Sequence, residues 1–308
     1  MRLAYIANYQ GQALVLKRPC LHNFSLAARV KIQLMAELLT QKSHEGEVIS
    51  QGQLEPQVGR DRFRARYFSG FVDPDPINST IPVRYVSTLS FRYATGFWES
   101  IQAQRLLDQR HQAKNFDLVL IYNLQRAQIG CALHASKRLG LPVVLQYEDD
   151  SFVDIHGHVK HGFTADRYRA SCREVLQLIS GGTAVSPYLL SQMPANIPKV
   201  LLRGIVSAEI QELARKNQSE RKNWVVFSGT HEGTQGLEQL IVAWRRLGLS
   251  DWELHLAGSG PLTPILQEMS KGDDRIVFRG VLNRQENARL LCQARIGMNP
   301  QDITKVPG

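Results

Sequence analysis

The chain has 308 residues, about twice the length of a typical domain, so two domains with sizeable cores are expected. It is 43% hydrophobic and 21% charged, as in an ordinary soluble protein. No apolar run approaches the roughly 18 residues that span a bilayer, which argues against a transmembrane protein. The first residues lead directly into a strand-like segment without a signal-peptide pattern, so we expect a cytoplasmic protein.

The net charge of +9 at pH 7 is unevenly distributed. Residues 1–222 contain 28 Lys and Arg against 19 Asp and Glu, whereas residues 223–308 contain nine of each. A basic amino-terminal part would be attracted to an anionic membrane surface or a lipid phosphate, which predicts peripheral contact with the inner face of the membrane. The alternative is an ordinary solvated basic surface. Nucleic acid is not an expected partner, since no aromatic RNA-binding motif accompanies the charge.

The amino-terminal part begins with an α/β pattern. Leu3–Asn8 predicts a strand and Ser25–Thr40 a helix with one apolar side, and the segment between them is expected to be a long loop. Asp117–Tyr122 and Pro142–Tyr147 have the continuous apolar character of buried parallel strands, and the helix between them should end at Gly140.

Four arginines alternate with other residues between these elements, at positions 60, 62, 64 and 66. In an extended segment Arg60, Arg62, Arg64 and Arg66 would share one face, which could bind phosphate groups bidentately. The favoured alternative is a solvent-facing edge strand whose charge prevents aggregation.

Three consecutive carboxylates, Glu148, Asp149 and Asp150, directly follow the strand that ends at Tyr147. Ligands of open α/β sheets bind at the carboxyl ends of the strands, so this position favours a functional role for Glu148. The alternative for Asp149 and Asp150 is that one of them caps a turn or a helix start.

The polar segment that follows contains Asp154, His156, His158 and His161, which could ligate a metal. The segment is loop-like and contains glycine, which favours an ordinary polar loop over a metal site, so no metal is expected. The four cysteines are widely spaced without a CxxC pair, which indicates reduced side chains that serve in packing. They are Cys20, Cys131, Cys172 and Cys292.

The carboxy-terminal part, residues 224–300, alternates four short strand-like runs with helical segments, which predicts a parallel sheet. After Gly236 an apolar stripe at helical spacing marks one helix, Pro261 suits the first position of a second, and Asn283 with Glu286 forms a capping-box pattern for a third. Gly229, Gly258 and Gly260 lie in the turns after the strands, where backbone N–H groups could hold phosphate.

The order of these segments resembles the nucleotide-sugar half of retaining GT-B glycosyltransferases of family four. The similarity rests on FSG, QGLEQLIVAWRRL, LHLAGSGPLTPILQEM and RIVFRGVLNRQENARLLCQARIGMNP, together with GTAVSPYLLSQM upstream. It implies an α/β fold of two Rossmann-like parallel-sheet domains, with an acceptor-side domain at 1–205, a linker at 206–221 and a nucleotide-sugar domain at 222–308. The expected activity is transfer of a hexose from a nucleotide-diphosphate sugar to a saccharide or lipid-linked acceptor in cell-surface polysaccharide synthesis, with no cofactor.

The resemblance also assigns roles to individual residues. Glu148 stands where these enzymes often have a sugar-contacting His, so Glu148 with its neighbour Asp149 is the candidate catalytic group, and Gly11 is the acceptor-side candidate in the loop after the first strand. The donor-binding candidates are Gly229, Thr230, Gln235, Gly258, Gly260, Arg279, Val281 and Leu282.

The chain departs from the family pattern at two donor positions. Thr230 and Gln235 occupy the places of an Arg and a Lys that neutralise the leaving diphosphate, so Arg279 or His231 would have to substitute. The resembled enzymes also continue beyond the point where this sequence stops, with a helix bearing two glutamates, so the second domain is expected to be truncated. Two alternatives remain open: a non-catalytic glycosyltransferase-like binding or scaffold protein, and a nucleotide-sugar epimerase.

Overall fold

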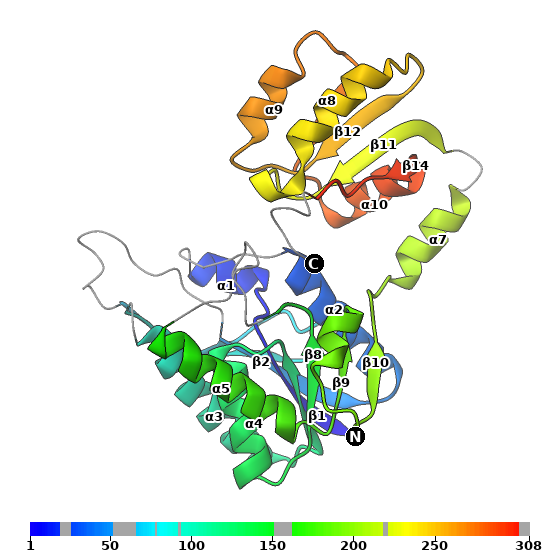
Figure 1. Cartoon of the computed structure of the whole chain (residues 1–308). Helices are drawn as coiled ribbons and strands as arrows, with labels where there is room; N and C mark the ends of the chain where they lie inside the picture. Colours follow the sequence, from blue (N-terminus) through cyan, green and yellow to red (C-terminus); the bar gives the residue numbers. More distant parts are fainter. Residues whose placement is uncertain are drawn as a thin grey trace. The chain divides into compact units, whose positions relative to one another are not determined.

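A computed structural model of the chain describes residues 1–18, 26–51, 66–77, 79–91, 94–150, 162–217 and 221–301. The described residues divide into two compact units, one ending at Ile205 and the other beginning at Val206. Each unit is built on its own parallel sheet, as the two-domain expectation requires (Figure 1).

The first unit contains an eight-stranded sheet in the order β10-β9-β8-β7-β1-β2-β5-β4. Neighbouring strands are parallel except for β4 and β5, and a separate antiparallel pair is formed by β3 and β6. The strands are β1 (Arg2–Ala7), β2 (Glu45–Ser50), β3 (Arg66–Phe68), β4 (Phe71–Val72), β5 (Val83–Tyr85), β6 (Thr88–Ser90), β7 (Leu118–Tyr122), β8 (Val143–Tyr147), β9 (Gly181–Ala184) and β10 (Lys199–Leu201).

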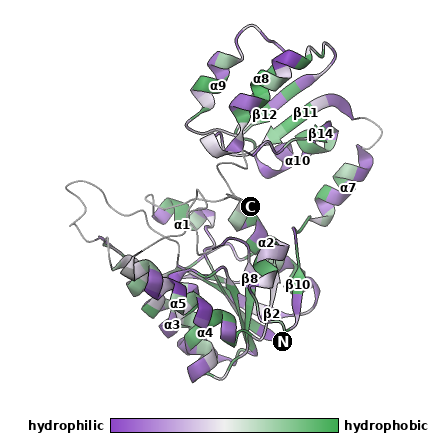
Figure 2. Ribbon diagram, viewed as in Figure 1, coloured by the Kyte–Doolittle hydropathy of each residue, from purple (hydrophilic) through white to green (hydrophobic). Residues whose placement is uncertain are grey.

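Helices cover both faces of this sheet (Figure 1). Helices α3, α4 and α5 pack one apolar face onto a core that includes Ile6, Ile121 and Leu145, and α2 packs on the other side against Tyr5 and Val48. The helices carry hydrophilic residues as well (Figure 2), as expected of helices with one face on a sheet. Their bounds are α1 (Gln12–Lys17), α2 (Leu26–Gln41), α3 (Thr95–Ala113), α4 (Arg126–Arg138), α5 (Phe163–Leu178) and α6 (Pro187–Ser191).

The second unit has a four-stranded parallel sheet in the order β13-β12-β11-β14. Helices α8 and α9 pack on one face against Phe227 and Leu256, whereas α10 packs on the other face against Val226 and Ala257. The elements are α7 (Ala208–Lys216), β11 (Lys222–Ser228), the 3-10 helix η2 (Gly233–Gln235), α8 (Leu237–Leu247), β12 (Glu253–Ala257), α9 (Thr263–Met269), β13 (Ile276–Gly280), α10 (Arg284–Gln293) and β14 (Ala294–Gly297).

Several local predictions are confirmed. The buried residues of α8 are Leu237, Leu240, Ile241 and Trp244, which are members of the predicted stripe. Both hydrogen bonds of the capping box between Asn283 and Glu286 are formed. Cys131, Cys172 and Cys292 are buried free thiols.

Other local predictions are wrong. The segment after β1 is not wholly a loop, because Gln12–Lys17 forms the helix α1 and buries Leu14. Pro261 lies in a turn rather than at the start of a helix, and α9 begins at Thr263 because the Thr263 N–H donates back to the Gly260 carbonyl (3.0 Å). The linker at 206–221 stays a prediction, and this stretch contains the helix α7, whose start is capped by the Ser207 hydroxyl.

Some sequence predictions fall on residues outside the described ranges. They concern Arg60, Arg62 and Arg64, the metal-site alternative with Asp154, His156, His158 and His161, and the cysteine Cys20. Arg66 is described and opens β3, which pairs with β6. No helix among the described residues combines the length and the apolarity needed to cross a membrane.

Candidate functional site

The carboxyl end of the first sheet brings Glu148 against Lys31, a residue of α2 that sequence analysis did not single out. The Lys31 ammonium contacts one carboxylate oxygen of Glu148 at 2.5 Å, and the Gln146 amide donates to the other at 2.9 Å. Gln146 in turn accepts a hydrogen bond from the Tyr5 hydroxyl (2.6 Å). The Glu148 side chain is only 7% exposed, so it is a largely buried carboxylate held in an ion pair.

Asn123 fixes the backbone that carries the two acidic residues. Its side-chain oxygen accepts from the N–H groups of Glu148 (2.7 Å) and Asp149 (3.1 Å), and its amide donates to the Asp149 carboxylate (2.8 Å). Asn123 adopts a left-handed conformation with φ of 60°, which Asn tolerates better than most residues. Asp149 is exposed, so its second oxygen can reach solvent or a ligand, and the capping alternative does not describe its contacts.

Burial dominates the acid–base behaviour of the tyrosines beneath this network. Desolvation raises the pKa of Tyr5, which is fully buried, and the nearby Tyr122 and Glu148 raise it further. Desolvation also raises the pKa of Tyr122, with Asp149 and Glu148 as additional causes. Both hydroxyls therefore remain protonated hydrogen-bond donors at neutral pH.

Gly11 also lies near the carboxyl end of the first sheet, as the residue that directly precedes α1. Its N–H donates to the Tyr85 hydroxyl (3.0 Å), which donates to Asp73 (2.9 Å). A Cβ atom at Gly11 would lie 2.6 Å from the Asp73 carboxylate and 2.7 Å from the Tyr85 oxygen. The absence of a side chain is thus required by a close contact with two polar groups.

In the second unit, the turns after β11 and β12 lie in direct backbone contact. A Cβ at Gly258, where φ is 122°, would lie 1.8 Å from the Gly229 carbonyl oxygen, and one at Gly260 would lie 2.6 Å from the His231 carbonyl oxygen. The His231 N–H donates to the Ser259 carbonyl (3.1 Å), which joins the two turns. Glycine is needed at both positions because no side chain fits between the turns.

The N–H groups of these turns fall into two sets. Those of Gly229, Gly258 and Gly260 are used internally, with acceptors at Ala257 (3.0 Å), Gly280 (2.7 Å) and the Thr263 hydroxyl (2.9 Å). Within the part of the chain that the structure describes, the N–H groups of Thr230 and Ser259 have no acceptor. Both residues are exposed, so these two N–H groups are available to a ligand.

His231 does not supply the cation that is missing at position 230. Its ring is completely buried and packs near Phe227 and Phe278, while its Nδ1 atom lies 2.9 Å from the Thr263 hydroxyl. Burial lowers the pKa of His231, so the ring is neutral at pH 7.

Arg279 is exposed, but its guanidinium is directed across the sheet. Its Nε atom donates to His255 (2.9 Å), and its Cζ lies 5.6 Å from the centroid of Trp224, near the start of β11. Of the other donor-side candidates, Gln235 ends η2 and is half-buried, Val281 is exposed, and Leu282 packs against the cluster that contains Val226. None of these places a positive charge at the turns.

The fold is that of the GT-B glycosyltransferases, with two Rossmann-like α/β units. Among solved structures, the chain is similar to sucrose-phosphate synthase from Thermosynechococcus elongatus, with 13% identity, a TM-score of 0.63, and coverage of 98% of this chain and 75% of that chain. It is also similar to HepE from Anabaena in complex with UDP, with 14% identity, a TM-score of 0.60, and coverage of 98% and 74%.

An epimerase has the same fold. UDP-GlcNAc 2-epimerase from Methanocaldococcus jannaschii matches with 11% identity, a TM-score of 0.52, and coverage of 96% of this chain and 78% of that chain. Neither a protein-family model nor a curated protein sequence matches the chain. At these identities the similarity establishes the fold, and the activity has to be argued from the residues.

Proposed function

We propose that the chain belongs to a retaining glycosyltransferase that moves a hexose from a nucleotide-diphosphate sugar to a saccharide or lipid-linked acceptor. The observation that carries this proposal is the pair of glycine turns after β11 and β12, where the N–H groups of Thr230 and Ser259 have no acceptor among the described residues. N–H groups at the carboxyl ends of parallel strands are suited to phosphate oxygens. The start of α8 adds the positive end of a helix of 11 residues.

The donor diphosphate would be held mainly by backbone dipoles. Such donors are fixed in place before the reaction and can stabilise the charge that develops on a leaving diphosphate. The match to HepE, whose structure contains UDP, supports a uridine nucleotide as the first donor to test. Gly229, Gly258 and Gly260 serve by allowing the turns to approach each other, and Gln235, Val281 and Leu282 are candidates for further donor contacts.

Glu148 is the proposed sugar-contacting carboxylate, with Asp149 as its neighbour. The contact with Lys31 holds the carboxylate in one orientation, and a carboxylate in this position can stabilise positive charge on an oxocarbenium-like transition state. Gly11 lies beside the same edge of the first sheet and is the candidate for acceptor-side contact.

The test is release of free nucleotide from UDP-hexoses and other nucleotide sugars by the purified chain, with and without saccharide and lipid-linked acceptors. Acceptor-dependent release of nucleotide is the expected result. Conversion of the donor to its epimer without any acceptor would identify an epimerase instead.

A binding or scaffold role is favoured by one specific observation. The cations expected at positions 230 and 235 are absent, His231 is neutral, and Arg279 contacts His255 and Trp224. If calorimetry shows that the chain binds a nucleotide sugar, and no turnover is found with any acceptor, the binding or scaffold role is favoured.

The finer proposal is that the acceptor is presented at an anionic membrane in cell-surface polysaccharide synthesis. It is supported by the basic excess in residues 1–222. Cosedimentation with phosphatidylglycerol vesicles should be strong at low salt and should decline as the Debye length falls to roughly 8 Å at physiological ionic strength. Binding to uncharged vesicles that is as strong as binding to the phosphatidylglycerol vesicles would contradict this proposal.

A further inference from the structure

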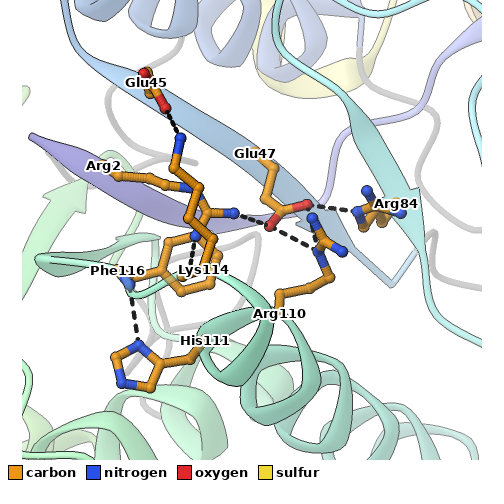
Figure 3. Close-up of polar contacts among 8 residues, drawn as sticks. All are labelled: Arg2, Glu45, Glu47, Arg84, Arg110, His111, Lys114 and Phe116. Atoms are coloured by element: carbon orange, nitrogen blue, oxygen red, sulfur yellow. Dashed lines mark hydrogen bonds and ion pairs between the residues drawn. The ribbon is translucent and has the colours of Figure 1, made fainter.

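A second charged cluster lies at the amino ends of the strands in the first unit, and the proposed glycosyl transfer does not use it. Glu47, in β2, is 1% exposed and contacts three arginines from three different elements (Figure 3). The distances to its carboxylate are 2.9 Å from Arg2 in β1, 2.5 Å from Arg84 in β5 and 3.0 Å from Arg110 in α3. Ligands of the proposed reaction would bind at the opposite, carboxyl end of the same strands.

One carboxylate neutralises one of these three charges, so the cluster keeps a surplus of two positive charges. A single arginine would suffice to pair a buried glutamate, and each additional guanidinium adds a cost of desolvation. The favourable field at the end of α3 accounts for Arg110 and Lys114 but not for Arg2 and Arg84, which lie on strands.

The guanidinium of Arg110 is only partly used by Glu47. Its Nε atom makes both contacts to the carboxylate, at 3.0 and 3.1 Å, and among the described residues its two terminal nitrogens have no acceptor. The side chain is 29% exposed. Two parallel N–H groups of this kind match the geometry of a phosphate group.

Arg110 opens onto a cavity of about 380 Å³. Its polar lining includes the basic side chains of Arg2, Lys114 and His44, the hydroxyls of Thr40 and Thr80, and the carboxylates of Glu45 and Glu47. Lys114 follows Arg110 by four residues and pairs with Glu45, but both side chains are more than 60% exposed, so this pair is weak and its lysine can turn to a ligand. The volume is within the range of small-molecule sites and exceeds what a free phosphate ion would fill.

We propose that this cavity is a second ligand site, which binds a small molecule carrying a phosphate-type oxyanion. Arg110 supplies the bidentate contact and Lys114 a further charge. Glu47 holds Arg110 at a fixed angle and limits the strength of binding by neutralising part of the cluster. The remaining volume, lined by threonine hydroxyls, suits a polar body such as a sugar.

Isothermal titration of the full chain tests the proposal with three probes: inorganic phosphate, a hexose monophosphate and the free hexose. We expect the hexose monophosphate to bind more tightly than phosphate, and the free hexose not to bind. Phosphate binding as tightly as the hexose monophosphate would identify an inorganic anion site and overturn the proposal of a small organic ligand.

Variants locate the binding. Arg110→Gln should weaken the affinity for the hexose monophosphate at least tenfold, and Lys114→Gln, which does not touch Glu47, at least threefold. Arg138→Gln is the matched control, since Arg138 is an exposed arginine in the last turn of the neighbouring helix α4. Unchanged affinity in both cavity variants, or no binding of any probe to the wild-type chain, would overturn the proposal.

Discussion

The two ends of the first sheet hold their buried carboxylates in contrasting ways. At the amino end, Glu47 is contacted by three arginines, whereas at the carboxyl end Glu148 is contacted by one lysine and one amide. A third buried carboxylate in the first unit is Glu99, in α3. It is 4% exposed and accepts a hydrogen bond from the Thr88 hydroxyl (2.6 Å). No ion pair to Glu99 is formed among the described residues.

The comparison shows that carboxylates of similar burial differ in their partners, and that the partners limit what each carboxylate can do. Three guanidiniums contact the Glu47 carboxylate, and the cluster leaves positive charge for a ligand. A single lysine contacts Glu148 at the carboxyl end of the sheet, where substrates of α/β proteins bind. For Glu99, desolvation outweighs the hydrogen bond from Thr88 and the charge of Arg18, and it raises the pKa to about 7.

Loss of the Glu47 carboxylate should have the largest effect. Glu47→Gln leaves the three arginines without their shared counter-charge, and removal of one partner from a buried ion cluster costs about 3 to 5 kcal/mol of unfolding free energy. Urea denaturation measures this change. Glu45→Gln is the control, because Glu45 forms an exposed pair with Lys114 and its loss should leave the denaturation midpoint unchanged. Equal midpoints for the two variants would contradict the structural importance of the cluster.

Glu99 should make the protein less stable as the pH rises. Its pKa is about 7 in the folded chain against an ordinary value of 4.5, so between these values the folded state binds more protons than the unfolded state. Stability contributed by the protonated side chain is therefore present below pH 4.5 and is lost as the pH rises to 7, by about 3 kcal/mol at most.

Glu99→Gln should remove this dependence, because the amide keeps a neutral hydrogen-bonding group at all pH values. Thermal unfolding of both proteins at pH 5 and pH 7.5 gives the difference. If the wild-type protein and the variant lose equal stability between these two values, Glu99 is not the titrating group.

At the carboxyl end of the second sheet, the turns contact each other through backbone atoms rather than through charged side chains. Gly258→Ala would force a Cβ into the Gly229 carbonyl and should destabilise this unit by about 2 kcal/mol. Gly272→Ala is the matched control, since Gly272 also has a positive φ (80°) but its Cβ would meet nothing within 4 Å. Chemical denaturation compares the two, and a larger effect at Gly272 would show that backbone strain, and not the close approach of the turns, requires the glycine.

Glu148→Gln tests the function of the carboxyl end of the first sheet, and its expected effect is the smallest of the predictions in free energy. Turnover should fall at least tenfold, equivalent to about 1.4 kcal/mol, while affinity for the donor changes little. Lys31→Met should also lower turnover, because it releases the carboxylate from its orientation.

The control for the Glu148 experiment is Glu37→Gln, on the same helix as Lys31, where Glu37 accepts a hydrogen bond from Gln33. Turnover of Glu148→Gln within a factor of two of wild type would exclude a catalytic role, and Asp149 would have to be tested separately.

The sequence determined several local elements and the presence of a parallel sheet in each part of the chain, but not the order of the strands in the first sheet. Periodic apolar residues fixed α8, and Asn283 with Glu286 fixed the start of α10, because both signals act between residues only a few positions apart. The glycines at 258 and 260 marked the turns, although the close approach of Gly258 to Gly229 was not visible in the sequence. Resemblance in the order of segments supplied the GT-B fold.

Only the tertiary structure determined which charged side chains contact each other. Nothing local to Lys31 or Glu148 predicts their contact, which joins residues 117 positions apart, and the three arginines of Glu47 come from positions 2, 84 and 110. The sequence likewise offered His231 as a cation, whereas packing between aromatic rings makes it neutral. A side chain's charge and its reach depend on long-range packing and on desolvation, and neither is encoded in the spacing of neighbouring residues.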